Sequence, residues 1–168
     1  MIWNATTTHY PPQTVSELFE DIVARTPEKV AVVFEQQTIS YEELNRRANQ
    51  LGHHLRTLGV GPEAVVAVLA ERSVETIVAL LAVLKAGGTY LPLEPSTPAE
   101  RLLFMMQDAG AKLLLTQQRL LERLPEHQVP VVLLDVDQHR MSSENLGAVG
   151  ATPEHLAYVM YTSGSTGT

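Results

Sequence analysis

Residues 64–69 read Ala-Val-Val-Ala-Val-Leu and contain no polar side chain. An apolar run of this length, without alternation, is typical of a strand covered on both faces, and such strands belong to parallel sheets. Gly61-Pro62 precedes the run as a turn, and Ser73 follows it as a helix cap. The stretch therefore predicts a buried parallel strand that leads into a helix.

Helices are predicted on both sides of this strand along the chain. Upstream, Ser40 and Glu43 form the pattern of a capping box, and Gly59 supplies a left-handed stop. The apolar residues between them keep helical spacing: Leu44, Ala48, Leu51, Leu55 and Leu58. Downstream, a helix starts at Ser73 and ends at Gly87-Gly88, and its predicted buried stripe consists of Ile77, Leu80, Leu81 and Leu84.

The N-terminal part predicts a linker, a helix and a hairpin. Residues 1–13 are polar and end close to two prolines, which predicts an extended linker because proline disfavours helix. Thr14 and Glu17 form the pattern of a second capping box. The apolar face of this helix is expected to be Val15, Leu18, Phe19, Ile22 and Val23. Residues 30–39 then predict a small hairpin.

The C-terminal half continues the alternation. Residues 89–91 predict a short strand that Pro92 breaks, and residues 97–100 (Thr-Pro-Ala-Glu) form the pattern of a capped helix start. The apolar face of that helix is expected to be Leu102, Met105, Met106 and Ala109. The same signals predict strands over residues 112–115 and 130–134, a short helix over 117–123, and a surface loop over 135–152.

Repeated alternation of strands and helices predicts an α/β fold. The sheet is expected to be open and mostly parallel, with helices on both faces and right-handed crossovers between strands. In folds of this class, ligands bind at the carboxyl ends of the strands.

The sequence ends in an apolar segment followed by a turn of hydroxyl groups and glycines. Residues 156–161 are rich in Tyr and Val, as expected of a buried strand. Backbone N–H groups free of side-chain bulk, together with hydroxyls, can close around a phosphate. An ordinary surface turn is the alternative, but a position at the carboxyl end of a strand favours phosphate binding. The residues of this turn are Thr162, Ser163, Gly164, Ser165, Thr166, Gly167 and Thr168.

The composition excludes several classes of function. The 168 residues carry a net charge of -7 and no basic run longer than Arg46-Arg47, so we expect no nucleic-acid partner. The absence of cysteine excludes disulfides, thiolate zinc sites and cysteine nucleophiles, which fits a cytoplasmic protein. The N-terminus lacks a signal-peptide pattern, and no apolar stretch is long enough to cross a membrane, so we expect no membrane partner.

Other candidate residues have simpler structural interpretations. Lys85 lies near the C-terminus of a predicted helix, where a cation is favoured. His53 and His54 are adjacent and therefore diverge on a helix, which argues against a metal site. The remaining candidates are interpreted as surface ion pairs and as core positions, respectively: Glu71, Arg72 and Glu75, and Met105 and Met106.

Three stretches, taken together, resemble one protein family. Residues 39–44 (Ile-Ser-Tyr-Glu-Glu-Leu) resemble the first core motif of adenylation domains from nonribosomal peptide synthetases. Residues 84–95 are similar to the second core motif, and residues 156–167 to the third, which is the family's phosphate-binding loop. Their order and spacing match as well. Residues 4–14 resemble the linker after a condensation domain, so the resemblance covers essentially the whole chain.

The sequence departs from the family pattern in two places. Thr89 and Glu94 stand where the second motif commonly has Ala and Asp, and both differences are mild. The third motif normally continues Pro-Lys-Gly, whereas this chain ends at Thr168. We therefore expect residues 14–168 to be the N-terminal portion of an adenylation domain, truncated at the phosphate-binding loop, and residues 1–13 to be the preceding linker. No catalytic residue of the family falls within the chain.

The resemblance implies a chemistry and a set of partners. The family activates an amino acid with ATP and Mg²⁺ as an aminoacyl adenylate and passes it to a phosphopantetheine thiol on a carrier domain. Residues 162–167 match the loop that binds the phosphates; this is not a Walker loop, because no Gly-Lys-Ser/Thr follows. The implied partners are the remaining adenylation subdomains and the condensation and carrier domains.

Three expectations follow for the chain by itself. As an isolated piece it is expected to be inactive. One alternative is a folding or interaction module that self-associates, or pairs with its missing part, through an open sheet edge. Another alternative is a fragment of an acyl-CoA ligase of the same superfamily, which the predicted linker and the second motif disfavour.

Overall fold

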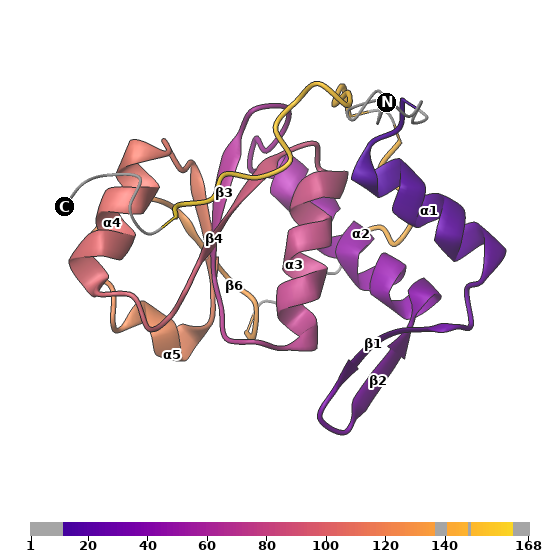
Figure 1. Cartoon of the computed structure of the whole chain (residues 1–168), viewed down its shortest axis with the longest axis horizontal. Coiled ribbons are helices and arrows are strands. Elements are labelled where there is room, and N and C mark those ends of the chain that lie inside the picture. The colour runs from indigo at the N-terminus through magenta and orange to yellow at the C-terminus, as the bar shows by residue number, and fades with distance from the viewer. Residues whose placement is uncertain (1–11, 137–140, 148, 163–168) are drawn as a thin grey trace, which may run out of the picture.

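The computed structural model describes residues 12–136, 141–147 and 149–162, and the predicted strands and helices are present from Val15 to Leu133 (Figure 1). The helices are α1 (Val15–Arg25), α2 (Tyr41–Thr57), α3 (Val74–Lys85), α4 (Ala99–Asp108) and α5 (Gln118–Leu121). The strands are β1 (Val30–Phe34), β2 (Gln37–Ser40), β3 (Val65–Leu69), β4 (Thr89–Leu93), β5 (Leu113–Thr116) and β6 (Val131–Leu133).

A parallel sheet with the strand order β4-β3-β5-β6 forms the centre of the fold. All five residues of β3 are buried, as the apolar run predicts. Leu69, the last residue of β3, pairs with Leu93 on one side and with Thr116 on the other. The chain therefore adds β4 on one side of β3 and then crosses to the other side to add β5 and β6, with all four strands parallel. This confirms the predicted open parallel architecture. β1 and β2 form a separate antiparallel hairpin, as predicted.

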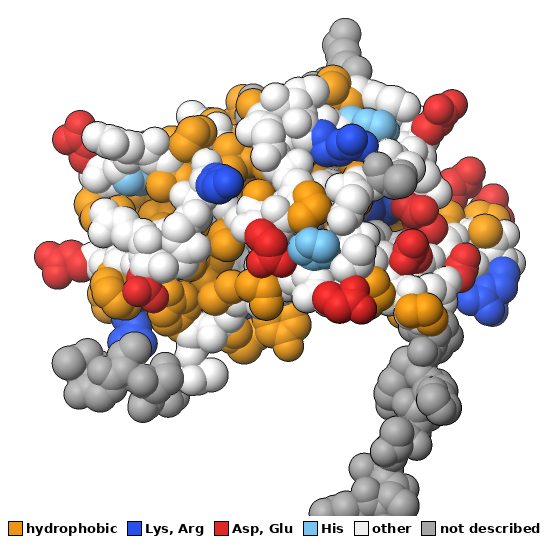
Figure 2. Space-filling view, turned by 90° about the horizontal axis from the view of Figure 1, so that it is seen from above, with side chains coloured by type: hydrophobic (Ala, Val, Ile, Leu, Met, Phe, Trp, Pro, Cys, Tyr) orange, Lys and Arg blue, Asp and Glu red, His pale blue; other side chains and the backbone are white. Residues whose placement is uncertain are grey.

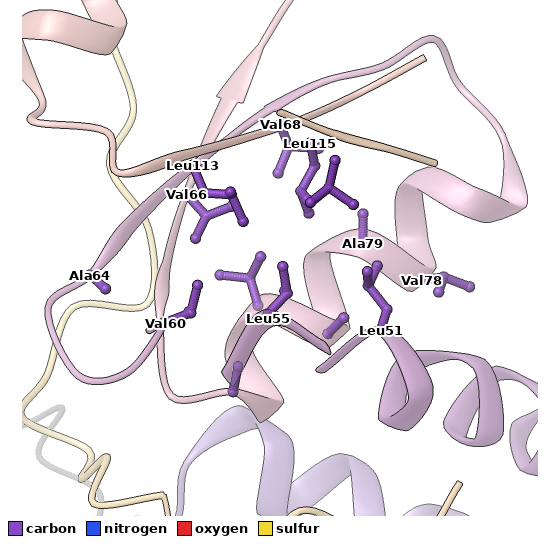
Figure 3. Close-up of a cluster of buried hydrophobic side chains, with 14 of the residues drawn as sticks. Leu51, Leu55, Val60, Ala64, Val66, Val68, Val78, Ala79, Leu113 and Leu115 are labelled. Atoms are coloured by element: carbon purple, nitrogen blue, oxygen red, sulfur yellow. The ribbon is translucent and has the colours of Figure 1, made fainter. Parts of the chain in front are cut away.

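Helices cover both faces of this sheet. Alternate residues of a strand point to opposite faces, so each strand contributes side chains to two cores. Val66 and Val68 of β3 belong to a core shared with α2 and α3, which Figure 3 shows with Leu55 of α2 and Leu115 of β5. The other three residues of β3, Val65, Ala67 and Leu69, belong to a second core on the opposite face. Helices α4 and α5 contribute further buried residues to this core: Leu102, Met105, Met106 and Leu120. The prediction of helices on both faces, with both methionines in the core, is confirmed.

The predicted helix caps are present at some helices and absent at others. α1 has the complete capping box of Thr14 and Glu17. At α2, Ser40 accepts the N–H of Glu43 at 3.2 Å, but the carboxylate of Glu43 binds arginines instead of closing the box. At α4 the N-cap is Pro98 and no side chain caps the helix, so the predicted Thr97 cap was wrong. The N–H of Thr97 is used in a turn with Glu94, which places Thr97 outside the helix.

The buried face of α3 overlaps the predicted stripe only in part: Leu80 and Leu81 are half-buried against the core, but the fully buried residues are different ones. Ile77 is 38% exposed, whereas Ala79 and Ala82 are fully buried. α3 is apolar on nearly every side, so periodicity does not define its inner face. Small side chains occupy that face because α2 approaches closely: a Cβ atom on Gly52 of α2 would lie 3.2 Å from the carbonyl oxygen of Ala82. The buried residues of α3 are Val74, Val78, Ala79, Ala82, Val83 and Lys85.

The apolar face of α1 is less buried than its pattern predicts. No residue of α1 is fully buried, and Val15, Leu18 and Ile22 are 52%, 45% and 37% exposed. Phe19 is half-buried and is the part of the stripe that packs on the core of α2 and α3. The predicted stripe is therefore wider than the surface on which α1 rests.

The acidic side chain of Glu43 links the start of α2 to two arginines, and this predicts an acid-sensitive contribution to stability. Its carboxylate oxygens lie 2.7 Å from Nε of Arg46 and 2.6 Å from Nε of Arg47. Hydrogen bonds from Arg46, then Arg47, lower the pKa of Glu43 from 4.5 to about 2, against the opposing effect of partial burial. A lowered carboxyl pKa stabilises the fold above the unfolded value, and this stabilisation is lost as the pH falls toward 2.

We expect Glu43→Gln to lower the free energy of unfolding by about 1 kcal/mol at neutral pH, since the pair is partly exposed. The difference from the wild type should shrink between pH 4.5 and pH 2, the two pKa values of Glu43. Urea unfolding across that range measures it. The exposed neighbour provides the control: Glu42→Gln should stay within about 0.5 kcal/mol at every pH. If the difference in the free energy of unfolding between Glu43→Gln and the wild type persists unchanged at pH 2, the lowered pKa of Glu43 is not its source.

Candidate functional site

The predicted phosphate-binding turn lies at the boundary of the described residues. Thr162 is described and exposed at the end of the terminal segment. Ser163, Gly164, Ser165, Thr166 and Gly167 lie outside the described residues, so their assignment to a phosphate site stays a prediction. What the structure describes is the segment that leads to the turn, residues 149–162.

This segment lies along the outer edge of β4 and runs in the same direction. The N–H of Tyr90 donates to the carbonyl of Ala157 at 3.1 Å, and the N–H of Val159 donates to the carbonyl of Tyr90 at 3.0 Å. The hydroxyl of Thr89 donates to the carbonyl of Leu156 at 2.8 Å. These contacts form a single parallel bridge between Tyr90 and Tyr158, not the predicted full strand.

Pro92 explains both the length of β4 and the shortness of this bridge. Odd-numbered residues of β4 point their N–H groups toward β3, as the bond from Thr89 to the Ala64 carbonyl shows. Tyr90, and hence Pro92, face the outer edge. The missing N–H of proline is therefore tolerated within β4, which continues to Leu93, so the predicted break was wrong. The same missing donor ends the outer ladder after one bridge.

The terminal segment is half-buried and not, as predicted, fully buried. Its side chains alternate in exposure: Leu156, Tyr158 and Met160 are 52%, 52% and 62% exposed, and the residues between them are half-buried. The ring of Tyr158 stacks on Tyr90, with centroids 5.6 Å apart. Alternation is what one covered face predicts. Hydrophobic side chains also reach the surface elsewhere on the molecule, as Figure 2 shows for one face.

Tyr161, directly before Thr162, connects the segment to α4. Its ring packs against the core shared with α4, and its hydroxyl donates to the carboxylate of Asp108, the last residue of that helix. Burial first, and then the bond to Asp108, raise the pKa of Tyr161 to about 12. The hydroxyl therefore stays protonated, and able to donate, throughout the neutral range.

A pocket of about 130 Å³ lies away from Thr162, at the amino end of β4. Gly87 and Gly88, which precede β4, line it together with the start of α1 and residues 151–153 and 155–157. Because ligands in parallel sheets bind at the carboxyl ends of the strands, this pocket does not coincide with the predicted phosphate site.

A buried polar cluster joins three helices and was not predicted from the sequence. Lys85 at the end of α3 is 2% exposed, and its ammonium group pairs with the carboxylate of Glu20 in α1. The Lys85 nitrogen also lies 3.5 Å from Oδ1 of Asn145, which accepts bonds of 3.0 Å from the amides of Asn45 and Asn49 in α2. Burial lowers the pKa of Lys85, and the bond to Glu20 opposes that shift.

Several of the other sequence candidates have structural partners, but Arg72 makes no ion pair within the described residues, so the ion pair predicted for it was wrong. His53 lies 3.0 Å from the carbonyl of Glu144. Glu71 pairs with Arg119, and Glu75 lies 3.8 Å from Arg47, so both carboxylates make the surface ion pairs that were predicted for them. Among the described residues no three His, Asp or Glu side chains are grouped to hold a metal ion. In the same part of the chain no helix has both the length and the apolar character to span a membrane.

A family model described as AMP-binding enzyme matches residues 19–168. The chain belongs to the AMP-binding enzyme family. Within this family it is similar to gramicidin S synthase 2 of Aneurinibacillus migulanus, with 48% identity over 167 residues, covering 98% of this chain and 4% of that protein. Zwittermicin A synthase ZmaJ of Bacillus cereus is 47% identical, over 91% of this chain and 29% of that protein. The chain therefore spans a small part of these AMP-binding relatives.

Solved structures of similar proteins share the fold. The nonribosomal peptide synthetase FmoA3 (S1046A) matches with a TM-score of 0.88 and 36% identity, covering 94% of this chain and 17% of that chain. The N-terminal subdomain of Klebsiella oxytoca NpsA matches with a TM-score of 0.83 and 26% identity, covering 94% and 41%. These matches confirm the resemblance to adenylation domains of nonribosomal peptide synthetases, in their N-terminal part.

Proposed function

We propose that this chain is the part of an amino-acid-activating adenylation domain that carries the phosphate-binding loop, residues 162–167. The observation that carries the proposal is the terminal segment 156–162, which has the third-motif sequence and runs parallel to β4 at the edge of a parallel sheet. In the proposed reaction the amino-acid carboxylate attacks the α-phosphorus of ATP, the bond to the β-phosphate oxygen breaks, and pyrophosphate leaves. The thiol sulfur of phosphopantetheine then attacks the acyl carbon of the adenylate, the bond from that carbon to the phosphate oxygen breaks, and a thioester and AMP are formed.

The donor set of the loop fits the phosphates of ATP. Thr162, Ser163, Ser165 and Thr166 carry hydroxyls, and glycines permit a tight turn with backbone N–H groups free of side-chain bulk. Hydroxyl and N–H donors match phosphate oxygens, on which charge grows as pyrophosphate leaves. Mg²⁺, when bound to those oxygens, neutralises part of this charge. The role of the loop residues is to hold the phosphates, and no residue of the chain is assigned proton transfer.

The proposal implies that partners supply the rest of the chemistry. We infer that the amino-acid pocket and the catalytic lysine belong to other parts of an adenylation domain, and that condensation and carrier domains act before and after it. The 4% share of gramicidin S synthase 2 that this chain matches is consistent with such a division of labour.

Amino-acid-dependent exchange of pyrophosphate into ATP tests the proposal. We expect the isolated chain to show no exchange with any of the proteinogenic amino acids, because it carries only the phosphate loop. The full-length protein that contains this sequence should show exchange with a narrow set of amino acids. Exchange that requires a carboxylic acid without an amine, followed by transfer to free coenzyme A, would instead identify an acyl-CoA ligase. Robust exchange by the isolated chain would contradict the proposal that the amino-acid pocket and the catalytic lysine lie in other parts of an adenylation domain.

The exposed edge of the sheet supports a second role, in association. Leu156, Tyr158 and Met160 are each more than half exposed beside β4, and an open edge with apolar side chains invites pairing. We infer that the isolated chain self-associates through this edge. Light scattering at two concentrations tests it, since a monomer at both would exclude this role.

A further inference from the structure

The contact between Tyr161 and Asp108 joins the terminal segment to α4 at the residue directly before Thr162. The backbone bonds between the segment and β4 are made further back, at Ala157 and Val159, and the carbonyl of Leu156 accepts from the hydroxyl of Thr89. Beyond them the outer ladder stops, because Pro92 offers no N–H. Directly before Thr162, Tyr161 connects the segment to α4 through its side chain.

The position of Asp108 is unfavourable for the helix that carries it. Asp108 is the last residue of α4, and no basic residue lies in that last turn. A carboxylate at a helix C-terminus meets the negative end of the helix dipole. A local choice that opposes helix stability points to a role outside the helix. The acceptor that Asp108 offers to the hydroxyl of Tyr161 is such a role.

The ring of Tyr161 reinforces the connection. It is half-buried against the core shared with α4, so its hydroxyl is held at the end of a rigid, packed group. A hydrogen bond from a neutral hydroxyl to a carboxylate is strengthened by the charge of the acceptor. Packing and bond together fix the backbone of residue 161, from which the loop begins.

We propose that Tyr161 is a positioning residue, which fixes the start of the phosphate-binding loop by donating its hydroxyl to Asp108. This inference rests on the proposed function of residues 162–167. A loop that binds phosphates through its N–H groups works best when these groups are aligned before ATP arrives. Loss of the hydrogen bond between Tyr161 and Asp108 should therefore raise the KM for ATP and leave the KM for the amino acid unchanged.

The kinetic test uses pyrophosphate exchange by the full-length protein that contains this sequence, with its preferred amino acid. Tyr161→Phe should raise the KM for ATP about tenfold, the effect of losing one hydrogen bond to a charged group. Asp108→Ala should do the same, and the double variant should be no worse than either single variant. Asp108→Asn keeps an acceptor oxygen and should recover most of the loss. The KM for the amino acid should not change.

Tyr158→Phe is the matched control, since its ring stacks on Tyr90 at the same edge, and its KM for ATP should equal that of the wild type. An unchanged KM for ATP in Tyr161→Phe would overturn the proposal. So would a rise in both KM values together with a lower Tm, because that pattern describes a general structural role.

Hydrogen exchange separates this proposal from the proposed function. Exchange at the amides of residues 162–168, followed by mass spectrometry, should quicken about tenfold in Tyr161→Phe and not in Tyr158→Phe, as expected for one lost hydrogen bond to a charged group. If the full-length protein activates no amino acid but this difference is present, the positioning role stands and the proposed function fails. Equal exchange in wild type and Tyr161→Phe would overturn the positioning role whatever the activity.

Discussion

Glu20→Gln is expected to lower the free energy of unfolding of this chain by about 3 kcal/mol, because it leaves the buried charge of Lys85 without its counter-ion. The side chain of Lys85 has no exposed surface, whereas that of Glu20 is 29% exposed. Lys85→Met should therefore cost less, about 1 kcal/mol, since the remaining carboxylate of Glu20 reaches water and methionine fills the lysine's apolar path. Urea unfolding at pH 7 compares the two variants.

The pH dependence of the Glu20→Gln variant gives a second measure. Burial lowers the pKa of Lys85 below its ordinary 10.5, and without Glu20 the pKa should fall further. A lysine with a lowered folded pKa destabilises the fold at low pH, and this cost fades as the pH rises toward the unfolded value. The deficit of Glu20→Gln should shrink between neutral pH and about pH 10.

Two comparisons complete the test of the Lys85–Glu20 pair. The exposed lysine Lys112 serves as control, and Lys112→Met should change stability by less than about 0.5 kcal/mol. The double variant Glu20→Gln/Lys85→Met should be more stable than the sum of the single effects predicts, because it leaves no unpaired charge. Additive effects, or a larger cost for Lys85→Met than for Glu20→Gln, would show that the pair does not act as described.

The parts of the fold that could be predicted depend on local signals. The capping box of Thr14 and Glu17, the apolar run of β3 and the left-handed Gly59 each act through neighbours in the chain. The buried face of α3 could not be predicted in the same way. Its sequence is apolar on nearly every side, and only the approach of Gly52 in α2 decides that Ala79 and Ala82 turn inward.

At the candidate site, too, features with a local sequence signal could be predicted, and contacts between distant residues could not. The hydroxyl-and-glycine turn could be proposed from the sequence because its signal is contiguous, whereas Glu20 and Lys85 are 65 positions apart and share no pattern. Pro92 was misjudged for a related reason. The residue type shows that a donor is missing, but only the pairing of β4 with β3 shows that the missing donor faces the outer edge. Asp108, similarly, is an ordinary acidic residue until Tyr161 is seen beside it.

The second large effect is expected at Gly88, where the chain turns from α3 into β4. A Cβ atom at this position would lie 2.7 Å from Cγ1 of Val60 and 3.2 Å from both the carbonyl of Ala64 and Cγ1 of Val83. Val60 and Val83 are buried, and neither has a flexible end that could move aside. Gly88→Ala should therefore lower the free energy of unfolding by about 2 kcal/mol through overpacking, measured by urea unfolding.

The control for Gly88 is a glycine from the same region. Gly61 has no positive φ, and a Cβ atom there would meet nothing within 4 Å, so Gly61→Ala should be neutral or slightly stabilising through the unfolded chain. Shortening Val60 to alanine removes the closest contact, so Gly88→Ala/Val60→Ala should be more stable than the two single losses predict. Equal stability of the Gly88→Ala and Gly61→Ala variants would mean that this turn relaxes, and that β4 does not need the close approach of backbone to core that Gly88 permits.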